Sequence, residues 1–221
     1  MTKAFLYETH LHTSETSACG KSSAADLVEA HYEQGYSGCV VTDHFFNGNC
    51  GVSQNLSWQE WVEGFCAGYE AAVIAAFDLD FDVFFGLEYN YNGTEFTTYG
   101  VDKTFLLMNP DMMSWSLEHY FEMVRAYGGF IIHVHPFREE VYIPKIRLYP
   151  DLVDAVEVEN LHNAKDAYNQ KALAYARRYD LPMTKGSDTH DVADICGGGM
   201  VFETRPKDIQ DMIEMIKKTR Y

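Results

Sequence analysis

Apolar residues along this chain follow two different periods. Short apolar runs of strand length occur near residues 4–9, 38–42, 82–88, 104–108, 130–135, 153–158, 182–186 and 200–203. Most segments between these runs carry apolar residues three or four positions apart, as on the buried face of an amphipathic helix. Strands that alternate with helices predict an α/β domain with a largely parallel sheet or barrel.

Start and stop signals bound the predicted helices. A capping box, Ser57-Trp58-Gln59-Glu60, begins one helix, Gly128 ends another, and Pro206 occupies the favoured first position of the last. We expect helices over about residues 22–34, 57–77, 117–127, 163–179 and from 206 onward. The Gly- and Asn-rich segment 45–56 is expected to be a long loop that either covers an active site or serves as a spacer.

The length and composition indicate one globular domain over residues 1–221, since 221 residues can form a substantial core and 47% of them are apolar. No apolar stretch reaches the roughly 18 residues of a membrane span, and the N-terminus has no apolar signal-peptide region. The five cysteines are widely spaced, and no two form a Cys-x-x-Cys pair. These features predict a cytoplasmic protein without a membrane partner.

The charge balance limits the kinds of partner. With 17 basic and 33 acidic residues, the formal net charge is −16. Phosphate backbones are bound by clustered Lys and Arg, so this acidity argues against long nucleic acids. Most of the acidity is expected to serve solubility, and part of it could come from carboxylates that bound cations neutralise.

Histidine and carboxylate residues stand at the ends of five predicted strands. His10 and His12 are two positions apart, so both point the same way at the end of the first strand. The other candidates follow later strands: His44 beside Asp43, Glu88, His135, Asp188 and His190. Functional groups of α/β folds gather at C-terminal strand ends. We therefore predict one multinuclear site for zinc, manganese or iron, the metals that imidazole and carboxylate ligands accept.

Taken in order, these segments resemble the PHP family, which is named for polymerase and histidinol phosphatase. The shared motifs are His10-x-His12, Thr42-Asp43-His44, an isolated Glu88, His135-Pro136 and Ser187-Asp188-x-His190. The resemblance covers roughly residues 6 to 200. It implies a distorted (β/α)7 TIM-like barrel with two or three divalent metal ions at its mouth. Most members are phosphoesterases, so it also implies a hydrolase.

The metal ligands that the resemblance implies are His10, His12, His44, Glu88, His135, Asp188 and His190. Many members place another His or Asp shortly after the first motif. Here Glu15 is the first choice for that position and Cys19 the second. Members with a full trinuclear site carry a further His on the strand after the isolated Glu, but the predicted strand 104–108 has none, so the third metal stays open. Asp43 is expected to orient a histidine.

The function that follows is hydrolysis of a small phosphate monoester by a metal-activated water. Arg138, three residues after His135, is the candidate that would grip and neutralise the phosphoryl group. Asp188 or His190 would assist proton transfer to the leaving oxygen. Two alternatives stay open: a phosphodiesterase or nuclease acting on short nucleotides, and a non-catalytic metal-binding barrel. The sequence also leaves the natural substrate and the oligomeric state open.

Overall fold

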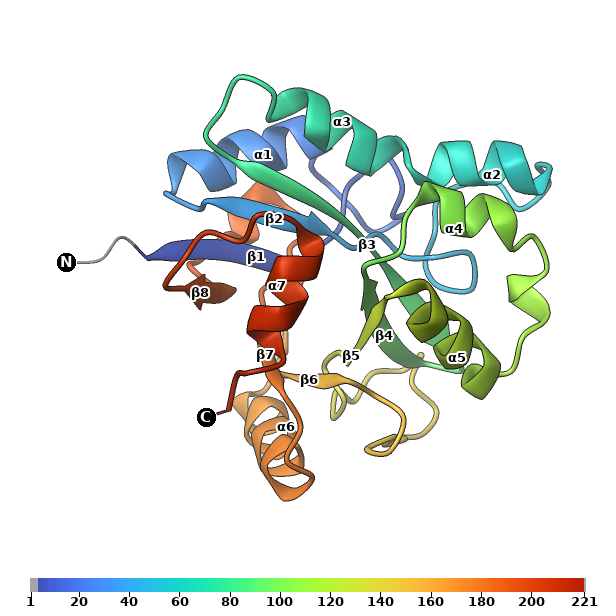
Figure 1. The fold of residues 1–221 in the computed structure, drawn as a ribbon, viewed down its shortest axis with the longest axis vertical. Helices are drawn as coiled ribbons and strands as arrows, with labels where there is room; N and C mark the ends of the chain where they lie inside the picture. The colour runs from blue at the N-terminus through green and yellow to red at the C-terminus, as the bar shows by residue number, and fades with distance from the viewer. Residues whose placement is uncertain (1–3, 221) are drawn as a thin grey trace.

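A computed structural model describes residues 4–220, which form one eight-stranded sheet with helices packed around it (Figure 1). The strands are β1 (Phe5–Leu11), β2 (Gly38–Val41), β3 (Asp82–Tyr91), β4 (Thr94–Tyr99), β5 (Phe130–His133), β6 (Ala155–Asn160), β7 (Met183–Gly186) and β8 (Met200–Phe202). The helices are α1 (Ala24–Glu33), α2 (Trp58–Phe65), α3 (Ala67–Ala75), α4 (Lys103–Met108), α5 (Leu117–Tyr127), α6 (Asp166–Arg178) and α7 (Ile209–Ile216). Across the sheet the strands follow the order β7-β6-β5-β4-β3-β2-β1-β8.

The sheet curls into a nearly closed barrel because its two ends meet at β1. The strand β8 pairs antiparallel with the first half of β1. Just beyond β7, Thr189 O accepts a hydrogen bond from His12 N at 2.9 Å, and Thr189 N donates one to His10 O at 3.0 Å. This arrangement confirms the predicted distorted TIM-like barrel. The distortion lies at β4, which runs antiparallel to both β3 and β5.

A buried carboxylate reinforces the closure. Glu8 on β1 is fully buried, and one of its oxygens accepts hydrogen bonds from the backbone N–H groups of Thr9, His10 and Ser187, each at 2.9 Å. Two of these donors lie where the register between β1 and β2 shifts, between Glu8 and Leu11. The carboxylate therefore ties the end of β1 to the segment that follows β7.

The helices form where their caps and apolar faces agree. Ser23 caps α1, and Ser57 and Glu60 form the predicted capping box of α2. The apolar faces of α2, α4, α5 and α6 contribute to one hydrophobic cluster, in which Trp61 and Phe105 are almost fully buried. The segment 57–77, predicted as one helix, forms two, because α2 ends and α3 begins at Cys66.

Between β3 and β5 one prediction is wrong, and one strand is missing from the prediction. The run 104–108 is the helix α4, whose first turn Asp102 caps by accepting from Phe105 N at 2.8 Å. A short apolar run does not distinguish strand from helix by its period. The strand in this region is β4, which escapes prediction because four of its six residues, TEFTTY, are Thr or Glu. The Asn92-Gly93 turn before it, with φ of 53° and 84°, is a hairpin signal that could have located it.

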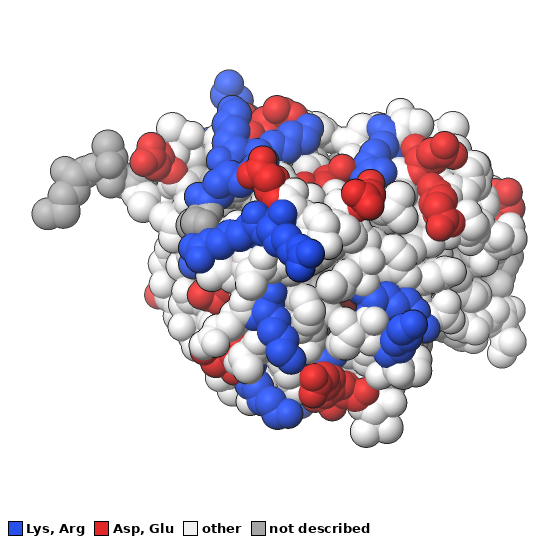
Figure 2. All heavy atoms as spheres, turned by 90° about the horizontal axis from the view of Figure 1, so that it is seen from below, with Lys and Arg blue, Asp and Glu red and all other residues white. Residues whose placement is uncertain are grey.

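The surface mixes charges of both signs. Figure 2 shows Lys and Arg side chains gathered on one face with Asp and Glu among them. Surface cations also pair with carboxylates, as Arg205 does with Asp82 at 2.7 Å. Among the described residues, no helix has the length and apolar character that a membrane crossing needs.

Candidate metal centre

Seven of the eight predicted metal ligands lie together at the C-terminal ends of the barrel strands. They come from β1 (His10, His12), the turn after β2 (His44), β3 (Glu88), the turn after β5 (His135) and the segment after β7 (Asp188, His190). Six of them are buried, and the side chain of the seventh, His190, is 13% exposed. The strand ends thus bring residues far apart in sequence into one cluster at the barrel mouth.

Two carboxylates alternate with the imidazoles of this cluster. Glu88 Oε2 lies 2.5 Å from His44 Nδ1, and Glu88 Oε1 lies 3.2 Å from His10 Nε2. Asp188 Oδ1 lies 3.2 Å from His12 Nε2. Several groups of three side chains therefore offer ligand atoms within 4.8 Å of one another.

Four buried atoms of the cluster lie 2.5–3.2 Å from one another or from a carboxylate oxygen but form no hydrogen bond of good geometry, namely His10 Nε2, His12 Nε2, His44 Nδ1 and Glu88 Oε2. A buried polar atom without a partner costs about 1–3 kcal/mol. Divalent cations between these atoms would satisfy them, and imidazole and carboxylate are ligands that zinc, manganese and iron accept. The residues present therefore fit the metals that the sequence predicts.

The surroundings keep the two central carboxylates ionised. Burial acts to raise the pKa of Glu88, but the neighbouring His44 and His10 hold this pKa well below its usual range. Burial also opposes ionisation of Asp188, and His10 and Arg138 hold the pKa of that carboxyl well below its usual range. Both side chains are therefore available as anionic ligands at neutral pH.

A carboxylate behind the cluster orients His10. Glu157 on β6 is buried, and its Oε1 lies 2.9 Å from His10 Nδ1. Its Oε2 accepts from His135 N and from Asn160 Nδ2, both at 2.9 Å. Because Nδ1 of His10 is occupied, Nε2 is left to face the cluster. In the sequence Glu157 is one carboxylate at a strand end, 147 positions from the histidine that it holds, so this role could not be assigned there.

We predict that Glu157→Gln weakens metal binding roughly 10- to 100-fold, the usual effect of removing a carboxylate that holds a metal-bound histidine. The amide keeps the size of the side chain but loses the charge that fixes the His10 tautomer. Chelator competition would measure the affinity. Glu159→Gln is the matched control, because the side chain of Glu159 on the same strand is 42% exposed. Equal affinities for wild type and Glu157→Gln would contradict the orienting role.

Asp43, expected to orient a histidine, reaches His12 only through Ser17. Its carboxylate accepts hydrogen bonds from Thr13 N at 2.7 Å, Thr13 Oγ1 at 2.8 Å and Ser17 Oγ at 2.6 Å. Ser17 Oγ also lies 3.3 Å from His12 Nδ1 and accepts from His44 N at 3.0 Å. The carboxylate therefore fixes the loop after β1 and, through it, two of the predicted ligands.

The structure corrects the prediction for Glu15. This residue is exposed, and both of its carboxylate oxygens accept from Ala24 N at 3.0 Å, at the first turn of α1. A carboxylate is stabilised at a helix N-terminus, so Glu15 has a structural role away from the cluster. Cys19, the second choice, lines the cavity that His190 and His44 also line. Although burial opposes ionisation, the neighbouring His190 and His44 lower the pKa of Cys19 to about 6.

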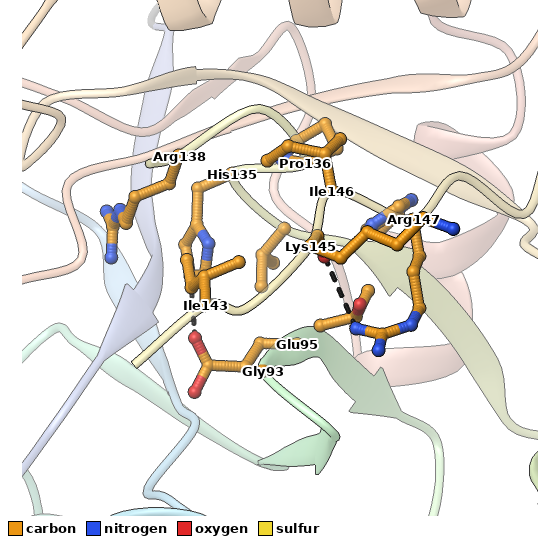
Figure 3. Close-up of a pocket in the computed structure, with 12 residues that line it drawn as sticks. Gly93, Glu95, His135, Pro136, Arg138, Ile143, Lys145, Ile146 and Arg147 are labelled. Atoms are coloured by element: carbon orange, nitrogen blue, oxygen red, sulfur yellow. Dashed lines mark hydrogen bonds and ion pairs between the residues drawn. The ribbon is translucent and has the colours of Figure 1, made fainter. Parts of the chain in front are cut away.

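Glu95 on β4 belongs to the cluster but is absent from the predicted ligands. It is buried, and its Oε2 lies 3.7 Å from His135 Nε2, which itself lies 3.2 Å from Glu88 Oε1. Its other oxygen accepts from Asn90 Nδ2 at 2.9 Å. Figure 3 shows Glu95 and His135 facing one another. The strand that follows Glu88 is therefore β4, which carries Glu95. The sequence predicts this strand at 104–108, where no candidate ligand occurs.

Arg138 is fixed at the edge of the cluster. Its Nη2 donates to Asp188 Oδ2 at 2.7 Å and to Asn160 Oδ1 at 2.9 Å. Its Nε donates to Asn163 Oδ1 at 3.0 Å. Figure 3 shows the Arg138 side chain next to His135. Arg138 is 8% exposed. Burial and these three hydrogen bonds together hold its guanidinium in one orientation at the site.

The cluster lines one side of a cavity of about 520 Å³, a size typical of sites for small ligands. Besides the predicted ligands, its wall contains Asn47, Asn49, Asn90, Tyr142 and His162. Two of these asparagines belong to the loop 45–56. That loop therefore forms part of the wall of the site, one of the two roles expected for it.

The C-terminal part of the chain matches a known family. Residues 166–221 match the family model described as PHP-associated. No curated protein matches the chain.

Several solved structures share the fold. A two-domain protein from Bacteroides vulgatus that contains a predicted PHP-like metal-dependent phosphoesterase has a TM-score of 0.66 and 16% identity, with 86% of this chain and 53% of that one covered. PsfC from Pseudomonas syringae has a TM-score of 0.67 and 18% identity, with 96% and 88% covered. An amidohydrolase from Chromobacterium violaceum, with bound sulfate and no metal, has a TM-score of 0.61 and 13% identity, with 95% and 96% covered. At these identities the likeness shows the fold, and this chain spans about half of the Bacteroides protein.

Proposed function

Because the match to the PHP-associated model and the structural neighbours support a PHP domain protein, we propose that the chain is a metal-dependent phosphoesterase that hydrolyses small phosphate monoesters. One observation carries the proposal. Buried imidazoles and carboxylates whose ligand atoms form no hydrogen bonds of good geometry lie beside a fixed guanidinium, at a cavity of small-ligand size.

The residues that would hold metal ions are those of the cluster: His10, His12, His44, Glu88, Glu95, His135, Asp188 and His190. Two or three ions of zinc, manganese or iron fit this number of ligands. When bound, divalent ions would polarise the phosphoryl oxygens and lower the pKa of water in the site.

Arg138 would bind the phosphoryl group. Its Nη2 and Nε are held by Asp188, Asn160 and Asn163, so the planar guanidinium is oriented before substrate arrives. A guanidinium can donate to two phosphoryl oxygens and offsets the charge that develops on them. A monoester dianion carries more negative charge than a diester, so the Arg138 guanidinium together with bound divalent ions would favour the monoester.

His190 is better placed than Asp188 to move a proton to the leaving oxygen. Its ring lines the cavity with 13% of the side chain exposed, whereas the Asp188 side chain is 3% exposed and is bound by Arg138. His190 Nδ1 lies 2.8 Å from the Asp188 carbonyl oxygen, which leaves Nε2 either to bind a metal ion or to exchange a proton, and the proton transfer requires that Nε2 is not bound to metal.

The test begins with metal content, measured by plasma mass spectrometry on protein purified without chelator or affinity tag. The same protein is then assayed with an aryl phosphate monoester and the matching diester. We expect two or three metal ions per chain and faster monoester hydrolysis, which a chelator abolishes and added zinc, manganese or iron restores. Faster diester hydrolysis would favour the phosphodiesterase alternative. Less than one ion per chain after reconstitution with all three metals would favour a non-catalytic barrel.

A further inference from the structure

We infer that the substrate is the phosphate monoester of an uncharged alcohol of sugar size that carries several hydroxyl groups. The inference rests on the proposed function and deepens it, because it concerns the alcohol from which the phosphoryl group is removed. It follows from the part of the cavity wall outside the metal cluster, which we call the alcohol subsite. The subsite consists of Asn47, Asn49, Asn90, Tyr142 and His162.

The charged groups of the cavity wall gather at the cluster. Among the described residues that line the cavity, the carboxylates are cluster ligands, and the only Lys or Arg is Arg138, which contacts Asp188 at 2.7 Å. The alcohol subsite itself contains no carboxylate, Lys or Arg. Tyr142 is uncharged at neutral pH, because burial raises its pKa to about 12. With the cluster carboxylates neutralised by bound cations, a charged group on the alcohol would find no counter-charge here.

The cavity is larger than a phosphoryl group needs. Its volume of about 520 Å³ is within the range of sites that enclose a whole small molecule. The proposed function places the phosphoryl group at the cluster and Arg138, so the space beside the alcohol subsite is left for the alcohol. A sugar-sized alcohol fits that space better than a very small one.

Two asparagines of the subsite offer amide N–H groups in a fixed orientation. Asn47 Nδ2 donates to the Asn90 carbonyl oxygen, and Asn47 Oδ1 accepts from Asn90 N at 3.3 Å. Asn90 Nδ2 donates to Glu95 Oε1 at 2.9 Å, and Asn90 Oδ1 accepts from Gly93 N at 3.1 Å. Since a side-chain amide has two N–H groups, each asparagine keeps one for a ligand. A hydroxyl group can accept from it, whereas an apolar alcohol would displace water and leave it unpaired.

An aromatic ring is fixed at the other side of the subsite. His162 N donates to Asn160 Oδ1 at 3.0 Å, the same oxygen that accepts from Arg138 Nη2. The centroid of the His162 ring lies 5.3 Å from that of His190. His162 is therefore held in place relative to the guanidinium that would bind the phosphoryl group. Rings with apolar faces and a polar atom, such as His162 and Tyr142, suit a sugar, which presents both C–H and hydroxyl groups.

The test compares esters that differ in one charged group. Glucose-6-phosphate is paired with glucosamine-6-phosphate, which adds an ammonium group, and glucitol-6-phosphate with gluconate-6-phosphate, which adds a carboxylate. At neutral pH we expect kcat/KM of the metal-loaded protein to be roughly 10-fold or more higher for the uncharged member of each pair. Cyclohexylmethyl phosphate, which has a ring without hydroxyl groups, is expected to be a poorer substrate than glucose-6-phosphate. Phosphonate analogues of the first pair resist hydrolysis, and their affinities, measured by calorimetry, should follow the same order.

Asn49→Asp tests the subsite by adding the missing counter-charge. Asn49 is exposed where it lines the cavity, and the substitution keeps the size of the side chain. The ratio of kcat/KM for glucosamine-6-phosphate to that for glucose-6-phosphate is expected to rise about 2- to 5-fold, as for a partly exposed ion pair. Asn55→Asp is the matched control, because Asn55 is exposed in the same loop and does not line the cavity, so it should leave this ratio unchanged. Thermal melts would show that both variants are folded.

The inference would be overturned if the charged member of either pair, or cyclohexylmethyl phosphate, were as good a substrate as its uncharged, hydroxylated counterpart. An Asn49→Asp ratio equal to that of the wild type would overturn it as well. An aryl phosphate, assayed on the same samples, separates this failure from failure of the proposed function. Hydrolysis of the aryl phosphate without the expected preferences would reject the sugar-like alcohol and leave the phosphoesterase intact. Tighter binding of the uncharged phosphonate without hydrolysis of any ester would support the subsite and reject only the phosphoesterase.

Discussion

Glu88→Gln is expected to release metal and to lower kcat/KM for a phosphate monoester by on the order of 1,000-fold, since metal ions typically contribute several kcal/mol and each 1.36 kcal/mol is tenfold in rate. Glu88 lies between His44 and His10: its Oε2 is 2.5 Å from His44 Nδ1, and its Oε1 is 3.2 Å from His10 Nε2. The amide keeps the size of the side chain but removes the negative charge. One of its two polar atoms becomes a donor that cannot bind a cation.

Plasma mass spectrometry would measure the metal content of Glu88→Gln, and steady-state kinetics its activity. Glu118→Gln is the matched control, because Glu118 is exposed in the first turn of α5 and should leave both quantities unchanged. If Glu88→Gln retained the full metal content and the full activity, the cluster would not be the site of hydrolysis.

Arg138→Ala is expected to lower kcat/KM roughly 100- to 1,000-fold, the usual loss when one group that stabilises developing charge is removed. The metal content should stay unchanged, because Arg138 contacts Asp188 at 2.7 Å but is a cation and binds no metal itself. Arg138→Lys should recover only part of the activity, since an ammonium lacks the planar fork that reaches Asp188, Asn160 and Asn163 together.

Steady-state kinetics and inhibition by inorganic phosphate would measure the effect of Arg138→Ala. Weaker phosphate inhibition at unchanged metal content would show that Arg138 binds the phosphoryl group. Arg178→Ala, exposed on α6, is the control and should behave as wild type. Loss of metal together with activity would instead show that Arg138 acts by holding Asp188 in place.

Most side chains of the candidate metal centre can be found from the sequence because strand geometry places them. His10 and His12 share a face of β1 by the two-residue period, and the other motifs follow strands whose C-terminal ends meet in a barrel. That reasoning needs only local pattern and topology. It fails at Glu95, because β4 is an antiparallel strand of mostly polar residues that neither rule detects.

The local sequence pattern also cannot decide whether Glu15 or Cys19 lies at the site. Both are in the loop after β1, and its path depends on distant partners. Ser17 pairs with Cys50 in an isolated bridge, and Ser14 N bonds to Ser22 O at 3.0 Å. These contacts turn Cys19 toward the cavity and leave Glu15 at the start of α1. The resemblance ranks Glu15 first, because many members carry a His or an Asp shortly after the first motif, whereas the loop geometry brings Cys19 to the cavity.

The hydrogen bonds that close the barrel also determine when the site can form as the chain folds. The hydrogen bond from Ser187 N to Glu8 joins residues 179 positions apart. Next to it, the backbone of Thr189 forms hydrogen bonds with the backbone of His10 and His12. Closing so long a loop costs conformational entropy that is recovered only when the strands between are in place. The His10 and Asp188 ends of the cluster therefore meet late in folding. Tight metal binding is therefore expected only of chains in which β7 and the segment after it have folded. In shorter nascent chains the histidines of the cluster would not yet lie together.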